Sequence, residues 1–154
     1  NHKAQTVAAQ LADLGYSVLA TTDLAGAAQA ADVISCATLS PTPLIKGEWL
    51  KAGTHLDLIG SHTPRTREVD DEAIRRSEVF VDSRAGALHE TGELAIPIAE
   101  GLLKPEDVKA DIAELCKGTH AGRTDAEKIT LFKSAGMAVE DLAAALLVYQ
   151  SVTA

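Results

Sequence analysis

The sequence predicts an α/β fold with a parallel sheet, followed by an apolar C-terminal helix that needs cover from outside that sheet. Short apolar runs alternate with helix-patterned segments, which is typical of βαβ units. Residues 32–38 (DVISCAT) are almost wholly apolar, as expected for a strand that is buried on both faces. Residues 135–152 leave almost no polar face, so this helix is expected to be buried in a core or in a subunit interface.

The first half of the chain begins with a helix and continues with short strands. At residues 3–14 the apolar residues recur at helical spacing, and Gly15 stops the helix. The other elements expected up to residue 59 are a strand at 17–21, a helix that is capped by Asp23 and ends at Ala31, the strand at 32–38, a helical turn at 46–51 and a strand at 55–59.

The second half repeats the alternation and ends in the long apolar helix. Pro105 suits the first turn of a helix, where its missing N–H costs little. The elements expected here are a helix at 70–77, a strand at 79–82, a helix at 84–90, a loop containing Gly92 and Pro97, a helix at 104–115, a polar segment at 117–127, a strand at 129–132 and the helix at 135–152.

Composition indicates one domain and excludes several classes of partner. A chain of 154 residues is the size of about one domain. The net charge of -8 argues against nucleic acid, because phosphate binding needs a basic face. No apolar run approaches the roughly 18 residues of a membrane span, so no membrane partner is expected. Cys36 and Cys116 lack metal spacing and are expected to be free, buried thiols in a reducing, cytoplasmic environment.

Residues 53–71 are the most informative segment for function, because an apolar strand ends there at Gly60 and a polar loop follows. Ligands of open α/β sheets bind where strands end and such loops begin. His62 is the best local candidate for proton transfer, and the alternative is a solvated histidine. Arg65 and Arg67 either bind a carboxylate or phosphate or pair with nearby acids.

Other polar groups near strand ends allow two interpretations each. Glu68, Asp70 and Asp71 are interpreted as charges that compensate a helix start, and not as a metal site. The hydroxyls and amides of residues 38–40 either line a cofactor cleft or cap a turn. Residues 133–136 (KSAG) offer a cation and free helix-start amides to an anion, or simply form a tight turn.

The first residues carry information about a cofactor. Residues 1–3 (NHK) contain a basic side chain but no acid. If they close the second strand of a dinucleotide fold, the missing acid favours NADPH over NADH, because an acid there holds the ribose of NAD. The alternative is an ordinary helix start. The chain begins without Met, and we expect a further N-terminal part.

Three long segments in register resemble the ornithine cyclodeaminase/mu-crystallin family. They are GEWLKAGTHLDLIGSHTPRTREVDDEAI, VFVDSRAGALHETGEL and GRTDAEKITLFKSAGMAVEDLAAALLVY, and NHKAQTVAAQLADLG fits the segment after the second Rossmann strand. The resemblance implies a homodimer in which a Rossmann domain is inserted into a substrate and dimerisation domain. Residues 1–127 would be a partial NAD(P)-binding Rossmann domain, a doubly wound parallel sheet incomplete at its N-terminus. Residues 128–154 would return to the second domain, and the phosphate loop and substrate-binding Arg and Lys would precede residue 1.

The same resemblance implies which residues contact the cofactor, NADPH or NADH. The adenosine side would be contacted by Asn1, His2 and Lys3. The residues along the dinucleotide would be Thr38, Leu39 and Ser40. Those near the nicotinamide would be Ile59, Gly60, Ser61, His62 and Ala135. His62 is also the candidate catalytic residue, and no metal is implied.

One departure from the cyclodeaminase pattern bears on the reaction. Ornithine cyclodeaminases carry Asp at the position of His62 and Lys at that of Thr66, whereas this loop is more similar to mu-crystallin and to bacterial reductases of cyclic imines. An imine already formed needs positioning against the nicotinamide and a proton from His62 or water. The expected function is therefore NAD(P)H-dependent reduction of a cyclic imino acid such as Δ1-pyrroline-2-carboxylate. The alternatives are an ornithine cyclodeaminase or amino-acid dehydrogenase, and a non-catalytic mu-crystallin-like protein that binds NADPH or a small ligand.

Overall fold

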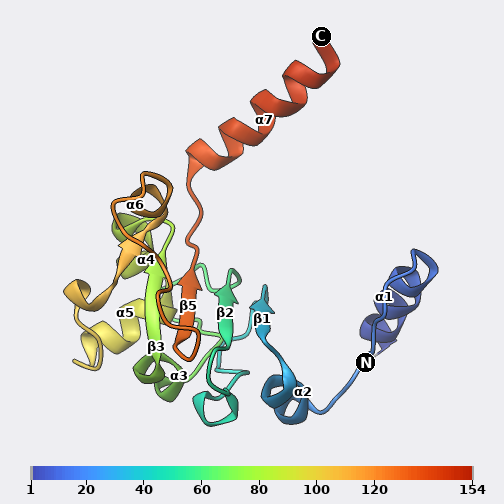
Figure 1. Cartoon of the computed structure of the whole chain (residues 1–154), viewed down its shortest axis with the longest axis horizontal. Helices are drawn as coiled ribbons and strands as arrows, with labels where there is room; N and C mark the ends of the chain where they lie inside the picture. Colours follow the sequence, from blue (N-terminus) through green and yellow to red (C-terminus); the bar gives the residue numbers. More distant parts are fainter. Residues whose placement is uncertain (1, 154) are drawn as a thin grey trace.

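The computed structural model describes residues 2–153 and confirms the α/β fold with a parallel sheet (Figure 1). Its five strands pair in parallel in the order β1-β2-β5-β3-β4. Their bounds are Val33–Cys36 for β1, His55–Leu58 for β2, Ser77–Val81 for β3, Ala110–Asp111 for β4 and Ile129–Lys133 for β5. The last strand of the chain therefore lies at the centre of the sheet, between β2 and β3.

Helices and helical turns connect the strands, most of them close to the predicted bounds. Asp23 accepts a hydrogen bond from the N–H of Gly26 at 2.9 Å, and Asp70 accepts one from the N–H of Ala73 at 3.0 Å, so both acids cap helices as predicted. The helical elements are α1 His2–Asp13, α2 Leu24–Ala30, η1 Gly47–Trp49, α3 Asp71–Arg76, α4 Arg84–Glu90, α5 Gly92–Ala99, η2 Pro105–Asp107, α6 Ile112–Cys116 and α7 Ala138–Thr153.

The hydrophobic core lies on one face of the sheet. Side chains alternate along a strand, so Leu56, Leu58 and Leu131 share a face, and all three are fully buried. Val79 and Val81 of β3 continue the same rows. Helices α3, α4 and α5 contribute buried apolar residues to this cluster. Each such side chain stabilises the fold by about 1.5–3 kcal/mol relative to an exposed one.

One predicted strand, at residues 17–21, does not form. These residues have no regular structure, and Leu19 is 86% exposed. A strand needs a partner strand for its backbone hydrogen bonds. No strand within residues 2–153 lies beside this segment, which explains why its apolar pattern was misleading.

The segment predicted as a loop because of Gly92 and Pro97 forms helix α5 instead. Gly92 is needed for close approach rather than for breaking a helix. Its N–H donates to the carbonyl of Thr63 at 2.8 Å, and a Cβ on it would press against the backbone of Thr66. Pro97 removes one helical hydrogen bond, a loss that a short helix near its end tolerates.

The helix predicted at residues 104–115 is replaced by the turn η2, the short strand β4 and the shorter helix α6. Residues 109–111 hydrogen-bond along the free edge of β3, which satisfies backbone groups that a helix would otherwise pair internally. Asp111 and Glu114 then start α6 with reciprocal hydrogen bonds of 2.9 Å between side chain and backbone. Hydrogen bonding to the edge of β3 therefore determined the structure of this segment, despite its helical propensity.

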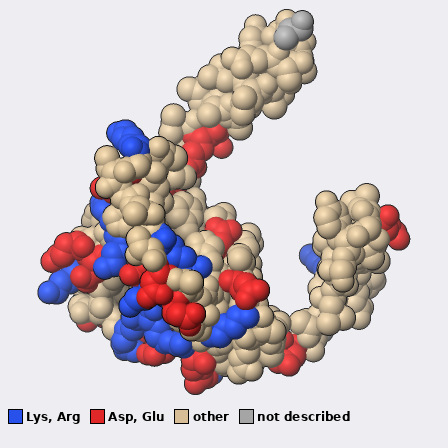
Figure 2. Space-filling model, viewed as in Figure 1, with Lys and Arg blue, Asp and Glu red and all other residues tan. Residues whose placement is uncertain are grey.

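The first and last helices stand away from the sheet (Figure 1). Neither α1 nor α7 has a buried residue, and Figure 2 shows that α7 is almost free of charge beyond its first turn. Its large exposed apolar side chains are Val139, Leu142, Leu146, Leu147, Val148, Tyr149 and Val152. Residues 2–153 thus do not supply the burial predicted for this helix. No helix in this range is long and apolar enough to cross a membrane.

The domain boundary predicted between residues 127 and 128 falls just before β5. This strand hydrogen-bonds to β2 and β3, so residues 129–133 belong to the sheet and only the chain after them leaves it. The assignment of the C-terminal part to a second domain stays a prediction.

The two cysteines provide a test of the fold. Cys36 in β1 is buried as predicted, and burial, reinforced by nearby carboxylates, raises the pKa of its thiol to about 11. The predicted burial of Cys116 is wrong, because this residue is exposed. Because the thiolate is the reactive form, we expect iodoacetamide at neutral pH to modify Cys116 quickly and Cys36 only after unfolding. Peptide mass spectrometry over time measures both rates. The Cys116→Ser variant should lose the fast phase, and equal rates in the wild type would contradict the burial of Cys36.

Candidate functional site

The carboxyl ends of all five strands lie at one edge of the sheet, because the strands are parallel. The loops that leave this edge contain most of the predicted site residues, namely Thr38, Leu39 and Ser40 after β1, Ile59, Gly60, Ser61 and His62 after β2, and Ala135 after β5. Behind these loops lie four buried charged side chains, those of Glu68, Asp82, Glu93 and Lys133.

Glu68 joins the first two loops. Its side chain is fully buried, and Oε1 accepts hydrogen bonds from the N–H of Thr38 at 2.6 Å and from the hydroxyl of Thr38 at 2.8 Å. Oε2 accepts a hydrogen bond from the N–H of Gly60 at 2.9 Å. The interpretation of Glu68 as a helix-start charge is therefore wrong, and only Asp70 and Asp71 lie at the start of α3.

Gly60 is where the two loops come closest. A Cβ at this position would overlap the backbone N and O of Thr38 and the carboxylate of Glu68. Backbone atoms that are fixed by hydrogen bonds cannot move aside cheaply, so no larger residue fits. The glycine, read from the sequence as the end of a strand, is required by this contact between neighbouring loops.

Asp82, which follows β3, holds the third loop. Its Oδ2 accepts hydrogen bonds from the hydroxyl of Ser134 at 3.1 Å and from the N–H groups of Ala135 and Gly136 at 2.7 Å each. The N–H groups that were predicted to bind an anion are thus hydrogen-bonded to the carboxylate of Asp82. These amides are not available to a ligand in this conformation.

Lys133 and Glu93 place opposite charges inside the core. Lys133 is fully buried in the same cross-strand row as Leu58, and its Nζ donates to the carbonyl of Leu58 at 3.0 Å. Glu93 accepts hydrogen bonds from the N–H groups of Glu68 and Val69, the latter at 2.8 Å. Burial lowers the pKa of Lys133, and nearby carboxylates oppose that shift. Burial raises the pKa of Glu93, and its backbone hydrogen bonds oppose that shift.

The raised pKa of Glu93 gives stability a pH dependence with a definite sign. Above the ordinary value of 4.5 the unfolded chain releases this proton first, so the folded state binds more protons. The free energy of unfolding therefore falls as pH rises from 4.5 through the raised pKa. We expect the Glu93→Gln variant to lack this decline, as measured by urea unfolding across the acid range. Parallel curves for the two proteins would contradict the assignment to Glu93.

Each of the first two loops exposes an apolar side chain next to the strand end. Leu39 is 76% exposed and Ile59 is 44% exposed, so a ligand at this edge would meet both side chains. The hydroxyls of Ser40 and Ser61 donate to carbonyls within their own loops, and Ser61 is only 1% exposed. Ala135 is half-buried and touches the position that a Cβ on Gly86 would occupy. Their roles toward a cofactor stay predictions.

The predicted adenosine contacts are not brought to this edge. His2 and Lys3 are exposed on α1, which lies apart from the sheet (Figure 1). A polar hollow of about 260 Å³ lies beside them, between α1 and residues 20–22. Asn1 lies outside the described residues, so the whole adenosine assignment stays a prediction.

His62 is exposed at the tip of the second loop. Its Nδ1 is 3.0 Å from the carbonyl oxygen of Gly60, a geometry in which Nδ1–H donates. That tautomer leaves Nε2 as an acceptor, and Nε2 makes no hydrogen bond to residues 2–153. The side chain is therefore oriented by its own loop while one ring nitrogen can exchange a proton with a ligand or with water.

Arg67 has a structural role, and Arg65 is exposed. Arg67 is 8% exposed, its Nε donates to the carbonyl of Val69 at 3.0 Å, and its guanidinium pairs with Asp71 at 2.7 Å. Of the two interpretations, pairing with a nearby acid is the one that holds for Arg67. Within residues 2–153, no group of three or more His, Cys, Asp and Glu side chains is arranged to hold a metal ion.

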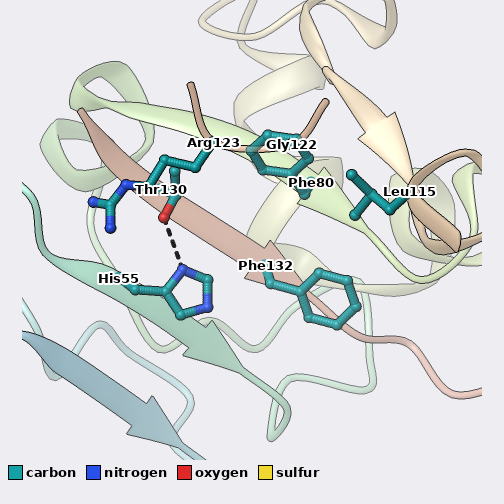
Figure 3. Close-up of a pocket in the computed structure, with 7 residues that line it drawn as sticks. All are labelled: His55, Phe80, Leu115, Gly122, Arg123, Thr130 and Phe132. Carbon is teal, nitrogen blue, oxygen red and sulfur yellow. Dashed lines mark hydrogen bonds between the residues drawn. The ribbon is translucent and has the colours of Figure 1, made fainter. Parts of the chain in front are cut away.

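A separate cavity of about 270 Å³ lies on the sheet face opposite the core (Figure 3). In it the Nδ1 atom of His55 and the hydroxyl of Thr130 are 2.8 Å apart, and burial lowers the pKa of His55. Its lining residues are His55, Phe80, Leu115, Gly122, Arg123, Thr130 and Phe132. None of them belongs to the strand-end loops, so this cavity is not part of the candidate site.

The fold matches solved structures that contain a bound nicotinamide dinucleotide. The structure of Δ1-pyrroline-2-carboxylate reductase from Thermococcus litoralis, in complex with NADH and L-proline, matches this chain with a TM-score of 0.86 and 36% identity. The match covers 90% of this chain and 43% of that one. An archaeal alanine dehydrogenase dimer with bound NAD matches with a TM-score of 0.88 and 33% identity, over 95% of this chain and 45% of that one.

Sequence comparisons agree with the resemblance noted above. The ketimine reductase mu-crystallin of Mus musculus is 45% identical over 121 residues, which are 79% of this chain and 36% of that protein. The chain thus spans well under half the length of this relative. The model of the ornithine cyclodeaminase/mu-crystallin family matches residues 1–154. The chain belongs to the ornithine cyclodeaminase/mu-crystallin family.

Proposed function

We propose that the full-length protein is an NAD(P)H-dependent imine reductase that converts a cyclic imino acid such as Δ1-pyrroline-2-carboxylate to the cyclic amino acid. The observation that carries this proposal is His62. An imidazole, oriented by Gly60, stands where a cyclodeaminase would carry a carboxylate. The likeness to a Δ1-pyrroline-2-carboxylate reductase and to a ketimine reductase supports the same class of reaction.

The residues present fit a nicotinamide dinucleotide at the carboxyl edge of the sheet. Leu39 and Ile59 offer exposed apolar surface at two adjacent strand ends, where flat rings can cover it. When bound, the reduced nicotinamide supplies the hydride that reaches the imine carbon, and the dinucleotide becomes oxidised. Lys3 favours NADPH over NADH in this proposal, and the two cofactors are compared in the assay below.

The residues of this chain position the nicotinamide and imine rings and transfer one proton. Reduction of the C=N bond adds a hydride to carbon and a proton to nitrogen. In this proposal His62 takes up a proton from water at Nε2 and passes it to the imine nitrogen, while its Nδ1–H stays bonded to the carbonyl of Gly60. An iminium carbon is strongly electrophilic, so positioning contributes most of the remaining rate.

The proposal is tested by following oxidation of NADPH and of NADH by the full-length protein with Δ1-pyrroline-2-carboxylate. We expect imine-dependent oxidation and formation of proline. Ornithine with NAD⁺ is the matched substrate control. Ammonia and proline from ornithine, without oxidation of NADPH by the imine, would instead identify a cyclodeaminase. Tight NADPH binding without turnover of either substrate would identify a ligand-binding protein.

An amino-acid dehydrogenase is the second candidate, favoured by the match to the archaeal alanine dehydrogenase. It is distinguished by NAD⁺ reduction with alanine, which an enzyme confined to cyclic imines does not catalyse. We also propose that the full-length protein is a homodimer in which residues 128–154 contribute to a second domain. The exposed apolar surface of α7 supports this arrangement, and light scattering measures the mass.

A further inference from the structure

We propose that Glu68 is a positioning residue of the dinucleotide site, whose buried carboxylate sets the separation of the loops after β1 and β2. This inference rests on the proposed function, because it assumes that both loops face the same ligand. The side chain sits behind the loops and does not reach solvent, so its effect on a ligand passes through Thr38 and Gly60.

The geometry of the contact shows why a carboxylate is needed. Three donors converge on one side chain, two from Thr38 on Oε1 and one from Gly60 on Oε2. An ionised carboxylate has acceptors on both oxygens, whereas an amide would turn an NH₂ group toward one of the donors. A carboxylate at this position therefore holds both loops at once, and a neutral isostere holds only one of them.

Glu68 is itself fixed from two directions. Its N–H donates to the carboxylate of Glu93 at 2.9 Å, and its carbonyl accepts from the N–H groups of Leu44 at 2.8 Å and Ile45 at 3.0 Å. The carboxylate that holds the loops is thus anchored to the start of α5 and to the segment after β1. A side chain held this firmly transmits its position to the atoms that it binds.

The residues that follow the fixed atoms are those predicted to meet the ligand. Leu39 comes directly after Thr38, and His62 comes two positions after Gly60. If the carboxylate no longer bridges the loops, the N–H of Ile59 still donates to the carbonyl of Cys36 at the strand ends, but the position of Leu39 beyond that hydrogen bond is no longer fixed. A flat ring system that contacts both loops then binds more weakly, even though no residue in contact with it has changed.

The experiment compares Glu68→Gln with the wild type in the full-length protein. The dissociation constant of NADPH is measured by the fluorescence of the reduced nicotinamide, without any imine present. We expect Glu68→Gln to raise this constant at least about tenfold. Thr38→Val removes one of the three donors to Glu68 and the acceptor of the Ser40 N–H, and we expect it to raise the constant about threefold. This binding assay contains no imine, so it does not depend on the reaction. If the wild type binds NADPH but does not reduce imines, the proposed function is refuted and the binding assay still tests this inference.

A matched control separates positioning from general loss of stability. Val108 is 3% exposed and precedes β4 at the other edge of the sheet, so Val108→Ala lowers the melting temperature without touching the loops. We expect its dissociation constant for NADPH to stay within twofold of the wild type. Unchanged binding by Glu68→Gln, or equal weakening by Val108→Ala, would overturn the inference.

A second readout needs no ligand. Hydrogen exchange of the Thr38 and Gly60 amides reports on their hydrogen bonds directly. We expect exchange in Glu68→Gln to be at least tenfold faster at the amide that faces the new NH₂ group, and slower exchange to persist at the other amide. If Glu68→Gln proves unable to fold, Thr38→Val serves instead, and we expect it to keep both amides protected. Rapid exchange at both amides in the wild type would show that the bridge is absent and would refute the inference.

Discussion

Replacing Gly60 with alanine is expected to destabilise the folded protein by about 3–5 kcal/mol, through overpacking and lost hydrogen bonds. The added Cβ would overlap the backbone of Thr38 and the carboxylate of Glu68. Relief requires the two loops to separate, which breaks the hydrogen bonds that Glu68 accepts and leaves buried donors unpaired. Urea unfolding of the full-length protein measures the loss, and the NADPH dissociation constant is expected to rise with it.

The control for this substitution is Gly101→Ala. Gly101 has a φ of +73°, and nothing lies within 4 Å of the position of its Cβ. Alanine there incurs backbone strain of about 1–2 kcal/mol without a collision. Gly60 does not have a positive φ, so its substitution tests collision alone. A loss for Gly60→Ala that is no larger than that for Gly101→Ala would contradict the close packing of the two loops.

The parallel sheet was predictable because its strands are marked by local patterns. The strands predicted at 32–38 and 55–59 need only short-range information, and both form close to the predicted bounds. The burial predicted for the first of them is wrong, because β1 lies at an edge of the sheet that residues 2–153 form and its Val33 is 62% exposed. Strand β4 was missed because residues 109–111 adopt it only beside the edge of β3. The strand expected at 17–21 does not form, because residues 2–153 contain no strand that pairs with it although its apolar pattern is present.

The sequence predicted where the candidate site lies, but not which side chain holds its loops together. The end of a strand at Gly60 gave the position of one loop, and residues 38–40 gave the position of the neighbouring loop. The carboxylate that joins them was misread because its partners lie 8 and 30 positions away in the chain. Lys133 was also misread, since a lysine beside a turn suggests solvent and an anion, whereas its row in the sheet places it in the core.

The second large effect is expected at His62. The His62→Ala variant should lower kcat for imine reduction about 100-fold, as is typical for loss of a general acid. The dissociation constant of NADPH should change far less than kcat, because within residues 2–153 the exposed imidazole bonds only to the carbonyl of Gly60 and its removal leaves the Glu68 bridge intact. Steady-state kinetics with NADPH and Δ1-pyrroline-2-carboxylate, together with nicotinamide fluorescence, measure the two quantities.

His89→Ala is the matched control for His62→Ala, since His89 is exposed near the end of α4 and should leave kcat unchanged. The His62→Asp variant carries the prediction further. It restores the acid of a cyclodeaminase, but Thr66 stands where such enzymes carry lysine, so we expect lower reductase activity and no ammonia from ornithine. If His62→Ala keeps kcat within threefold of the wild type, water rather than imidazole is the proton source. The loop would then act by shape alone, through the contact that Gly60 makes with Thr38.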